Sequence, residues 1–294
     1  MQKAQETFQN GPEKYRVLVP VSVSRDEEAL VQGLYQVFRN WKHPVEITLF
    51  HAVTIEGLHL RPAKGTNFYE NLSQYTHLIT KQLETYAQFL REKLPAHTIQ
   101  ILVEHDQILP PVEAVKGYLR SNPSDMVVIF HKGRQRWESW IGRTVFWDLF
   151  EELETAVLAI SQPFTFAPKR FLWLCEMDEE DYKHLPAVLS LIKVFEGSLY
   201  CAKVNTPASF YGHREFQRRV LAFCDHIVEH VDPDFVPQEC LQYNDKDVVA
   251  GAQHVMEDFL MDVMIIAPGG PLSLSEVGRL LASGNFGVLR LPFV

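Results

Sequence analysis

The chain alternates short apolar runs with longer stretches in which apolar residues recur every three or four positions. A run of four to eight Val, Ile, Leu and Phe residues is typical of a strand buried on both faces, whereas the wider spacing is typical of an amphipathic helix. Strands are predicted at residues 15–21, 45–52, 98–103, 125–130, 155–160, 170–176, 198–204, 238–242, 262–267 and 286–291. Helices are predicted at residues 27–38, 71–94, 111–119, 137–153, 179–195, 213–231, 248–260 and 273–282.

The same order of elements occurs twice. The text SDMVVIFHKG at 124–133 parallels MDVMIIAPGG at 261–270, and Pro163 and Pro168 flank a short polar and aromatic segment between the repeats. Strands joined by helical crossovers of this length lie parallel, with helices on both faces of the sheet. The pattern therefore predicts an α/β protein of two tandem doubly wound domains, 1–162 and 168–294, joined by a linker at 163–167. Each domain is expected to hold a five-stranded, mainly parallel sheet.

Composition narrows the class of protein. The 294 residues are 46% hydrophobic and 22% charged, which is a globular balance. The net charge of −9 excludes a nucleic acid partner, because no basic face is left to neutralise phosphates. The charge is uneven: residues 1–165 hold 17 Lys and Arg against 19 Asp and Glu, whereas the remainder holds 11 against 18. The longest apolar runs fall far short of the roughly 20 residues of a membrane helix, so no membrane segment is predicted.

The cysteines indicate a compartment. There are four, at 175, 201, 224 and 240, and none form a CxxC pair. Widely spaced cysteines of this kind favour reduced thiols in a cytoplasmic protein. The first residues are polar, so no signal peptide is expected. Cys175 and Cys201 lie in predicted strands and are interpreted as small core residues.

Two segments of the first repeat resemble a known family. The opening KYRVLVPVSVSRDEEAL and the segment DMVVIFHKGRQRWESWIGRTVFWDLFEELETAVLAI are similar to the first strand and the last third of the universal stress proteins. The resemblance implies the tandem form of that family, with its two halves paired about a pseudo-twofold axis. Flavodoxin-like and electron-transfer-flavoprotein-like folds share the alternation and are the competing interpretation.

The resemblance also implies where a nucleotide would bind. Members that hold ATP use an Asp after the first strand, a Gly-x-x-Gly turn, a later Gly, and a Ser or Thr at a helix start. Glycines let backbone N–H groups approach phosphate oxygens, and a helix N-terminus adds partial positive charge.

In the first half the pattern is eroded. Ser22 stands where the Asp is expected, and the turn begins with the bulky Phe130 in place of Gly. The retained candidates are Gly133, Arg134 and Thr144, in a basic segment that could attract an anion.

In the second half the Asp position is Glu176, which keeps the charge. The turn reads Ala-Pro-Gly-Gly at 267–270, and only a few residues separate Gly269 and Gly270 from Ser273 and Ser275 at a predicted helix start. The loop that would wrap a triphosphate is thus short. We therefore expect a degenerate site that holds no cofactor. If a ligand does bind, the resemblance implies ATP or AMP.

Two other features have competing interpretations. His226 and His230 are four residues apart on a predicted helix, a spacing that can serve a metal ion, but HIVEH lacks the HExxH pattern and a solvated helix face is favoured. The aromatic residues between 137 and 150 are either a core face or a seam between the two halves; the sequence does not separate these.

The function favoured by the sequence is non-catalytic. No residue set offers a nucleophile, a base and an oxyanion partner, so an enzyme is not predicted. The chain is interpreted as a stress-response or signalling protein of the universal stress type, an interaction module for an unknown protein partner. One alternative is a regulatory switch that binds ATP or AMP. Another is a soluble regulatory protein related to the tails of cation/proton antiporters, suggested by the Pro-Val-Ser opening at 20–22 without the usual Asp.

Overall fold

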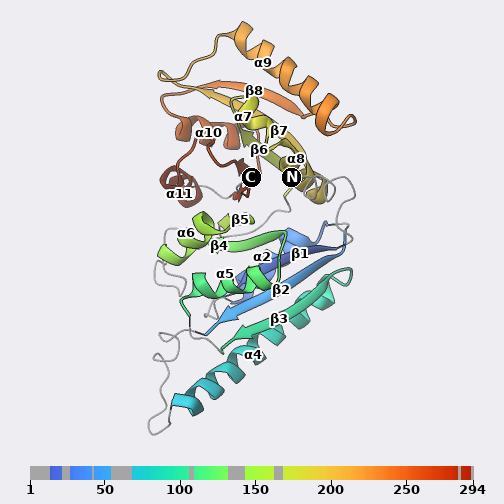
Figure 1. Ribbon diagram of the computed structural model, residues 1–294, viewed down its shortest axis with the longest axis vertical. Helices are drawn as coiled ribbons and strands as arrows, with labels where there is room; N and C mark the ends of the chain where they lie inside the picture. The colour runs from blue at the N-terminus through green and yellow to red at the C-terminus, as the bar shows by residue number, and fades with distance from the viewer. Residues whose placement is uncertain are drawn as a thin grey trace.

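The computed structural model describes residues 14–21, 27–41, 43–53, 68–105, 109–131, 143–161, 168–283 and 286–292. Within these ranges ten strands form one continuous sheet, in the order β3-β2-β1-β4-β5-β10-β9-β6-β7-β8 (Figure 1). The strands are β1 Tyr15–Pro20, β2 Val45–Ala52, β3 Thr98–Glu104, β4 Met126–His131, β5 Ala156–Ser161, β6 Arg170–Leu174, β7 Ser198–Asn205, β8 Glu239–Asn244, β9 Val263–Ile266 and β10 Gly287–Arg290. All ten predicted strands are confirmed to within two residues at either end.

The two halves of the sheet share one topology. Numbered from its own first strand, each half has the order 3-2-1-4-5, and the two meet edge to edge. Described strand pairs are parallel except at this junction, where β5 and β10 run antiparallel with Ile160 opposite Gly287 and Val157 opposite Arg290. The order therefore reads the same from both ends, as a twofold relation between the halves requires.

The predicted fold class of two tandem doubly wound units is confirmed, and the structure adds that their sheets merge into one. The predicted linker 163–167 lies outside the described residues. The division into 1–162 and 168–294 stays a prediction.

Helices cover both faces of the sheet. Their bounds are α2 Glu27–Phe38, α4 Phe68–Lys93, α5 Pro111–Ser121, α6 Arg143–Glu152, α7 Glu179–Tyr182, α8 Leu185–Phe195, α9 His213–His226, α10 Val248–Asp258 and α11 Leu274–Ser283, with a π-helical turn η1 Ile227–Val231 after α9. Buried side chains of α2, α4, α8 and α9 form one core layer, and those of α5, α6, α10 and α11 form the other. The doubly wound arrangement follows from this division.

The prediction of one continuous helix between β6 and β7 is wrong. The pattern predicts a single helix over 179–195, but the structure has two, α7 and α8, because Pro186 lies in the first turn of α8. Proline has no backbone N–H to continue the preceding helix, and it is favoured in the first turn of a new one. The predicted helix 213–231 likewise ends in the wider π-turn η1.

Each core layer continues across the junction between the halves. On one face, the rings of Trp41 and Phe195 meet edge to face with centroids 4.6 Å apart. On the other, the ring of Trp147 lies against Gly278 of α11, so closely that a Cβ at this glycine would sit 2.9 Å from a ring carbon. The aromatic segment is therefore a seam at Trp147 and core at Phe150, which is fully buried. Trp137 and Trp140 lie outside the described residues.

A pair of helical glycines tests this seam. Gly278→Ala is expected to lower the free energy of unfolding by about 1–3 kcal/mol, because overpacking against Trp147 outweighs the gain in helix propensity. Gly117→Ala, in α5, is the matched control: an added Cβ there meets nothing within 4 Å, and the expected change is a gain of about 0.4–1 kcal/mol. Urea unfolding of both variants measures the difference. If both variants are stabilised equally, the contact between Gly278 and Trp147 can accommodate an added methyl group, and the prediction is wrong.

Candidate functional site

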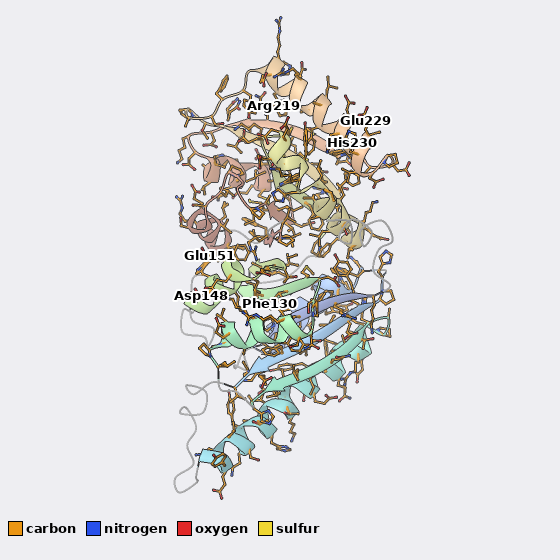
Figure 2. All side chains as sticks on the ribbon, viewed as in Figure 1. Phe130, Asp148, Glu151, Arg219, Glu229 and His230 are labelled. Atoms are coloured by element: carbon orange, nitrogen blue, oxygen red, sulfur yellow. The ribbon has the colours of Figure 1, made fainter. Side chains whose placement is uncertain are left out.

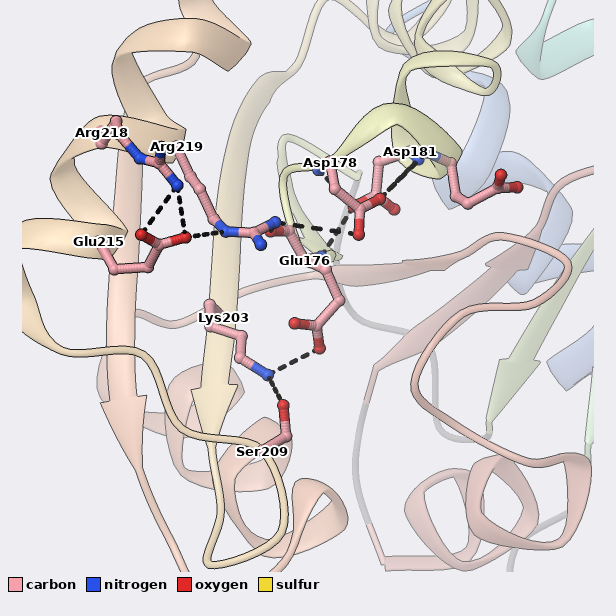
Figure 3. A network of polar contacts seen from close by, with 9 residues as sticks. Glu176, Asp178, Asp181, Lys203, Ser209, Glu215, Arg218 and Arg219 are labelled. Carbon is pink, nitrogen blue, oxygen red and sulfur yellow. Dashed lines mark hydrogen bonds and ion pairs between the residues drawn. The ribbon is translucent and has the colours of Figure 1, made fainter.

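The predicted ligand carboxylate of the second half lies directly after β6. Open α/β sheets bind ligands at this carboxyl edge. Glu176 Oε1 accepts a hydrogen bond from Lys203 Nζ at 2.7 Å, and the same ammonium donates to Ser209 Oγ at 2.7 Å (Figure 3). Lys203 is on β7, and its side chain is only 2% exposed. The carboxylate is thus engaged by an ammonium group of the protein itself.

Tyr211 covers this ion pair. Its ring centroid lies 4.8 Å from Lys203 Nζ and 4.4 Å from the guanidinium carbon of Arg219, so two cations contact one aromatic ring. Burial, together with a side-chain hydrogen bond to Glu176, raises the pKa of the Tyr211 hydroxyl to about 12. The hydroxyl therefore stays protonated and donates to the carboxylate.

The loop that carries Tyr211 is held by polar side chains of β7 and β8. Asn205, which is 3% exposed, accepts from the Tyr211 N–H at 3.0 Å and donates to the Tyr211 carbonyl at 3.1 Å. It also donates to Asn244 Oδ1 at 2.9 Å, and Gln242 donates to the same Tyr211 carbonyl at 2.7 Å. Tyr211 is therefore fixed from both strands.

Arg219 closes the outer side of the site from α9. Its Nε donates to Glu215 Oε1 at 2.9 Å, and its Nη1 lies 3.9 Å from Asp178 Oδ2. Asp178 also caps α7, where its carboxylate accepts from two backbone N–H groups. Each cation in Figure 3 has carboxylate partners. The cations of the site are thus paired with carboxylates of the chain itself.

The backbone turn after Glu176 is held by Asp181. Its Oδ2 accepts from the Glu176 N–H at 2.8 Å, and Met177 between them adopts the left-handed region with φ of 56°. Burial, and then repulsion by Asp178, raise the pKa of Asp181 to about 6. Asp181 is therefore a structural group of this turn.

The predicted phosphate turn is stabilised by its own contacts. Gly269 has a φ of +78°, in the left-handed region that favours glycine. The Gly270 N–H donates to the Ala267 carbonyl at 3.0 Å, and a Cβ on Gly270 would lie 2.9 Å from that oxygen. The turn itself therefore requires both glycines.

The helix N-terminus beyond this turn is also occupied. Glu276 Oε2 accepts from both the backbone N–H and the Oγ of Ser273, each at 2.7 Å, and these bonds lower the pKa of Glu276. The Ser273 and Ser275 hydroxyls lie 3.2 Å apart. A carboxylate of the chain thus lies where a bound phosphate would meet the start of α11.

In the first half, Gly133 and Arg134 lie outside the described residues, as does the side chain of Thr144 at the start of α6. Phe130, which Figure 2 labels, lies on β4 and packs against the core layer of α2 and α4. His51 is fully buried at the end of β2 and donates from Nδ1 to the Val21 carbonyl at 2.8 Å. Burial lowers the pKa of His51 to about 4, so the imidazole is neutral at pH 7.

Of the two helix histidines, His226 is the last residue of α9 and His230 lies in the π-helical turn η1. His226 stacks on Tyr182 with ring centroids 4.2 Å apart, and His230 meets His226 edge to face at 4.8 Å. Both His230 and the neighbouring Glu229 are well exposed (Figure 2). Across the ranges that the structure describes, no three His, Cys, Asp or Glu side chains are grouped so as to hold a metal ion.

Sequence reasoning missed Lys203, Asn205 and Tyr211. The signal was available in part: CAKVN is a strand whose apolar pattern is broken by polar residues at its carboxyl end. Tyr211 carried no signal, because only the fold of the loop brings it over β7.

The strand order defines a tandem α/β fold of the universal stress type. No protein-family model and no curated protein matches the chain. A universal stress protein from Archaeoglobus fulgidus DSM 4304 has the same fold, with a TM-score of 0.64 and 11% identity over 94% of this chain and 96% of that one. A protein of unknown function from Pseudomonas aeruginosa PAO1 matches with a TM-score of 0.57 and 12% identity, over 94% and 92% of the two chains.

A third solved structure belongs to another kind of protein. The cytoplasmic domain of a prokaryotic cation chloride cotransporter matches with a TM-score of 0.50 and 10% identity, over 94% of this chain and 95% of that one. At these identities the likenesses confirm the tandem universal stress fold. Among the helices that the structure describes, none combines the length and the apolar character needed to cross a bilayer.

Proposed function

We propose that this chain is a non-catalytic regulatory protein of the universal stress type, in which the second nucleotide site is closed by the chain's own side chains. The observation that carries the proposal is the bond between Lys203 and Glu176. A ligand hydroxyl that used this carboxylate would have to displace a buried ammonium, and burying an unpaired charge is strongly unfavourable.

The second support is Glu276 at the start of α11. Its carboxylate holds the backbone N–H and hydroxyl of Ser273, and its negative charge opposes a phosphate at the same place. The sugar hydroxyl and the phosphate of a nucleotide would therefore both meet positions that the chain's own side chains occupy. The chain then acts as an interaction module for a protein partner in the cytoplasm, without ATP or AMP as cofactor.

The test begins with the protein as purified. Denaturation followed by chromatography of the released small molecules is expected to yield no stoichiometric adenine nucleotide. Calorimetric titration with ATP and AMP, with and without Mg²⁺, is expected to give no binding heat. Glu276→Gln is the informative variant, because it keeps the size of the side chain and removes the charge that opposes phosphate. Stoichiometric nucleotide in the wild-type protein would overturn the closed site and make a nucleotide switch the primary function.

A second candidate function is regulation of a cation transporter. It is favoured by the likeness to the cotransporter's cytoplasmic domain, which extends over 94% of this chain. In that case the protein would sediment with the membrane fraction of its source cells and be released from it by salt. Recovery only in the soluble fraction at low salt would contradict this candidate and leave the stress-type module.

A further inference from the structure

The outer side of α9 and η1 carries a line of exposed side chains. Phe216, Phe223 and Ile227 are buried in the core layer and turn the other side of the helix toward the sheet. The exposed residues recur every three or four positions, so they share one side of the helix. We call them the α9 stripe: Arg214, Arg218, Leu221, Asp225, Val228 and Glu229. In Figure 1, α9 lies at one end of the long axis of the molecule.

The charges of the α9 stripe follow an order along the helix. Arg214 and Arg218 lie toward its start, and Asp225 and Glu229 lie toward its end. Between the two pairs is Leu221, which is 66% exposed. A helix has partial positive charge at its N-terminus and partial negative charge at its C-terminus, so this order is the reverse of the one that stabilises a single helix. The helix itself therefore does not account for the order.

We propose that the α9 stripe is the contact surface for a second copy of this chain, with the two helices antiparallel about a twofold axis. The axis passes between residues 221 and 222. Arg218 lies as far before this point as Asp225 lies after it, and the same holds for Arg214 and Glu229. Each arginine of one copy therefore meets a carboxylate of the other, and the symmetry forms each ion pair twice. The contact does not depend on the state of the nucleotide site.

The charges select the antiparallel arrangement. Two parallel helices would place like charges at the same level, whereas antiparallel helices pair opposite charges and set opposite ends of their dipoles side by side. Arg218 Nη2 already donates to both carboxylate oxygens of Glu215, at 3.0 and 2.9 Å. A guanidinium has five N–H donors, so Arg218 can bind a second carboxylate while it keeps this contact.

Sedimentation equilibrium of the full-length protein tests the contact. Each chain has a net charge of −9, and the long-range repulsion between copies is reduced in about 0.15 M salt, where charges interact over only about 8 Å. In that salt we expect the molar mass to rise with concentration from that of one chain toward that of two. The mass of a single chain at every concentration up to about 1 mM would overturn the proposal and leave the stripe to a different partner.

Two charge-reversed proteins test the orientation. Arg214→Glu/Arg218→Glu makes the charges of the stripe wholly acidic. Asp225→Arg/Glu229→Arg makes them wholly basic. Each protein alone is expected to have a dimer dissociation constant about tenfold or more above that of the wild type, because every ion pair of the contact becomes repulsive. An equimolar mixture of the two should form a heterodimer. A mixture that stays monomeric, or a reversed protein that dimerises as the wild type does, would overturn the antiparallel contact.

A control variant separates the stripe from the net charge. Lys183→Glu/Arg279→Glu changes the net charge by as much as the acidic stripe variant does, at two side chains outside the stripe that are 57% and 66% exposed. This protein is expected to dimerise as the wild type does. If it associates as weakly as the acidic stripe variant, net charge and not the stripe controls association, and the proposal is wrong.

Discussion

Replacing Arg290 with methionine is expected to lower the free energy of unfolding by about 3–5 kcal/mol, since each buried group that loses its hydrogen-bond partner accounts for roughly 1–3 kcal/mol. Arg290 is on β10 in the second half and is 4% exposed. Its guanidinium donates to the carbonyls of Leu153 and Thr155 in the first half and to that of Leu291 in the second. Burial lowers its pKa to about 10, so the group stays charged at neutral pH.

Urea unfolding measures this effect, and Arg279→Met on α11 is the control. Arg279 is 66% exposed, and its loss is expected to change the stability by less than about 0.5 kcal/mol. Arg290→Lys should recover only part of the loss, because an ammonium lacks the forked geometry that reaches several carbonyls. If Arg290→Met unfolds at the urea concentration of the wild type, the junction does not depend on this residue.

The second large effect is expected at the ion pair of the candidate site. Glu176→Leu should lower the free energy of unfolding by about 3–5 kcal/mol, because it leaves the buried ammonium of Lys203 without its carboxylate. The double variant Lys203→Met/Glu176→Leu should recover most of this loss, since apolar side chains of similar volume often replace a buried pair without penalty.

Chemical unfolding of the wild type, both single variants and the double variant closes this cycle. Glu180→Leu is the control for adding an apolar side chain, because Glu180 is 82% exposed and pairs only with the exposed Lys183 among the contacts described. If Glu176→Leu leaves the free energy of unfolding unchanged, the ion pair has no structural role. That result would favour a carboxylate that is held ready for a ligand.

The strands were predictable because they lie in the middle of a sheet covered on both faces. Such strands are continuous apolar runs, as VMII of β9 illustrates, and their pattern does not depend on distant partners. The break between α7 and α8 could also have been predicted, from the position of Pro186. The pairing of β5 with β10, which merges the two sheets, could not have been predicted. An edge strand that pairs with another strand has the same composition as an edge strand that a helix or loop covers.

The candidate site shows the same limit at the level of side chains. The position of Glu176 follows from strand order alone, but its state depends on Lys203, a residue 27 positions away on the neighbouring strand. Cys201 and Cys240 likewise share no signal in the sequence, and only the register of β7 and β8 makes them direct partners. Local pattern thus predicts where a site lies in this fold, and long-range contacts decide what occupies it.

The antiparallel joint between β5 and β10 has a consequence for how the halves diverge. Two separate copies that meet through one edge strand form an isologous interface, so any substitution appears twice and must suit both sides. Here β5 and β10 belong to a single chain, so a substitution in one strand has no counterpart in the other. A buried arginine can stand on one side and bare backbone carbonyls on the other, as at Arg290 and Leu153. The same freedom lets one half carry a neutral imidazole beside its first strand while the other carries a carboxylate, so the repeats are free to specialise.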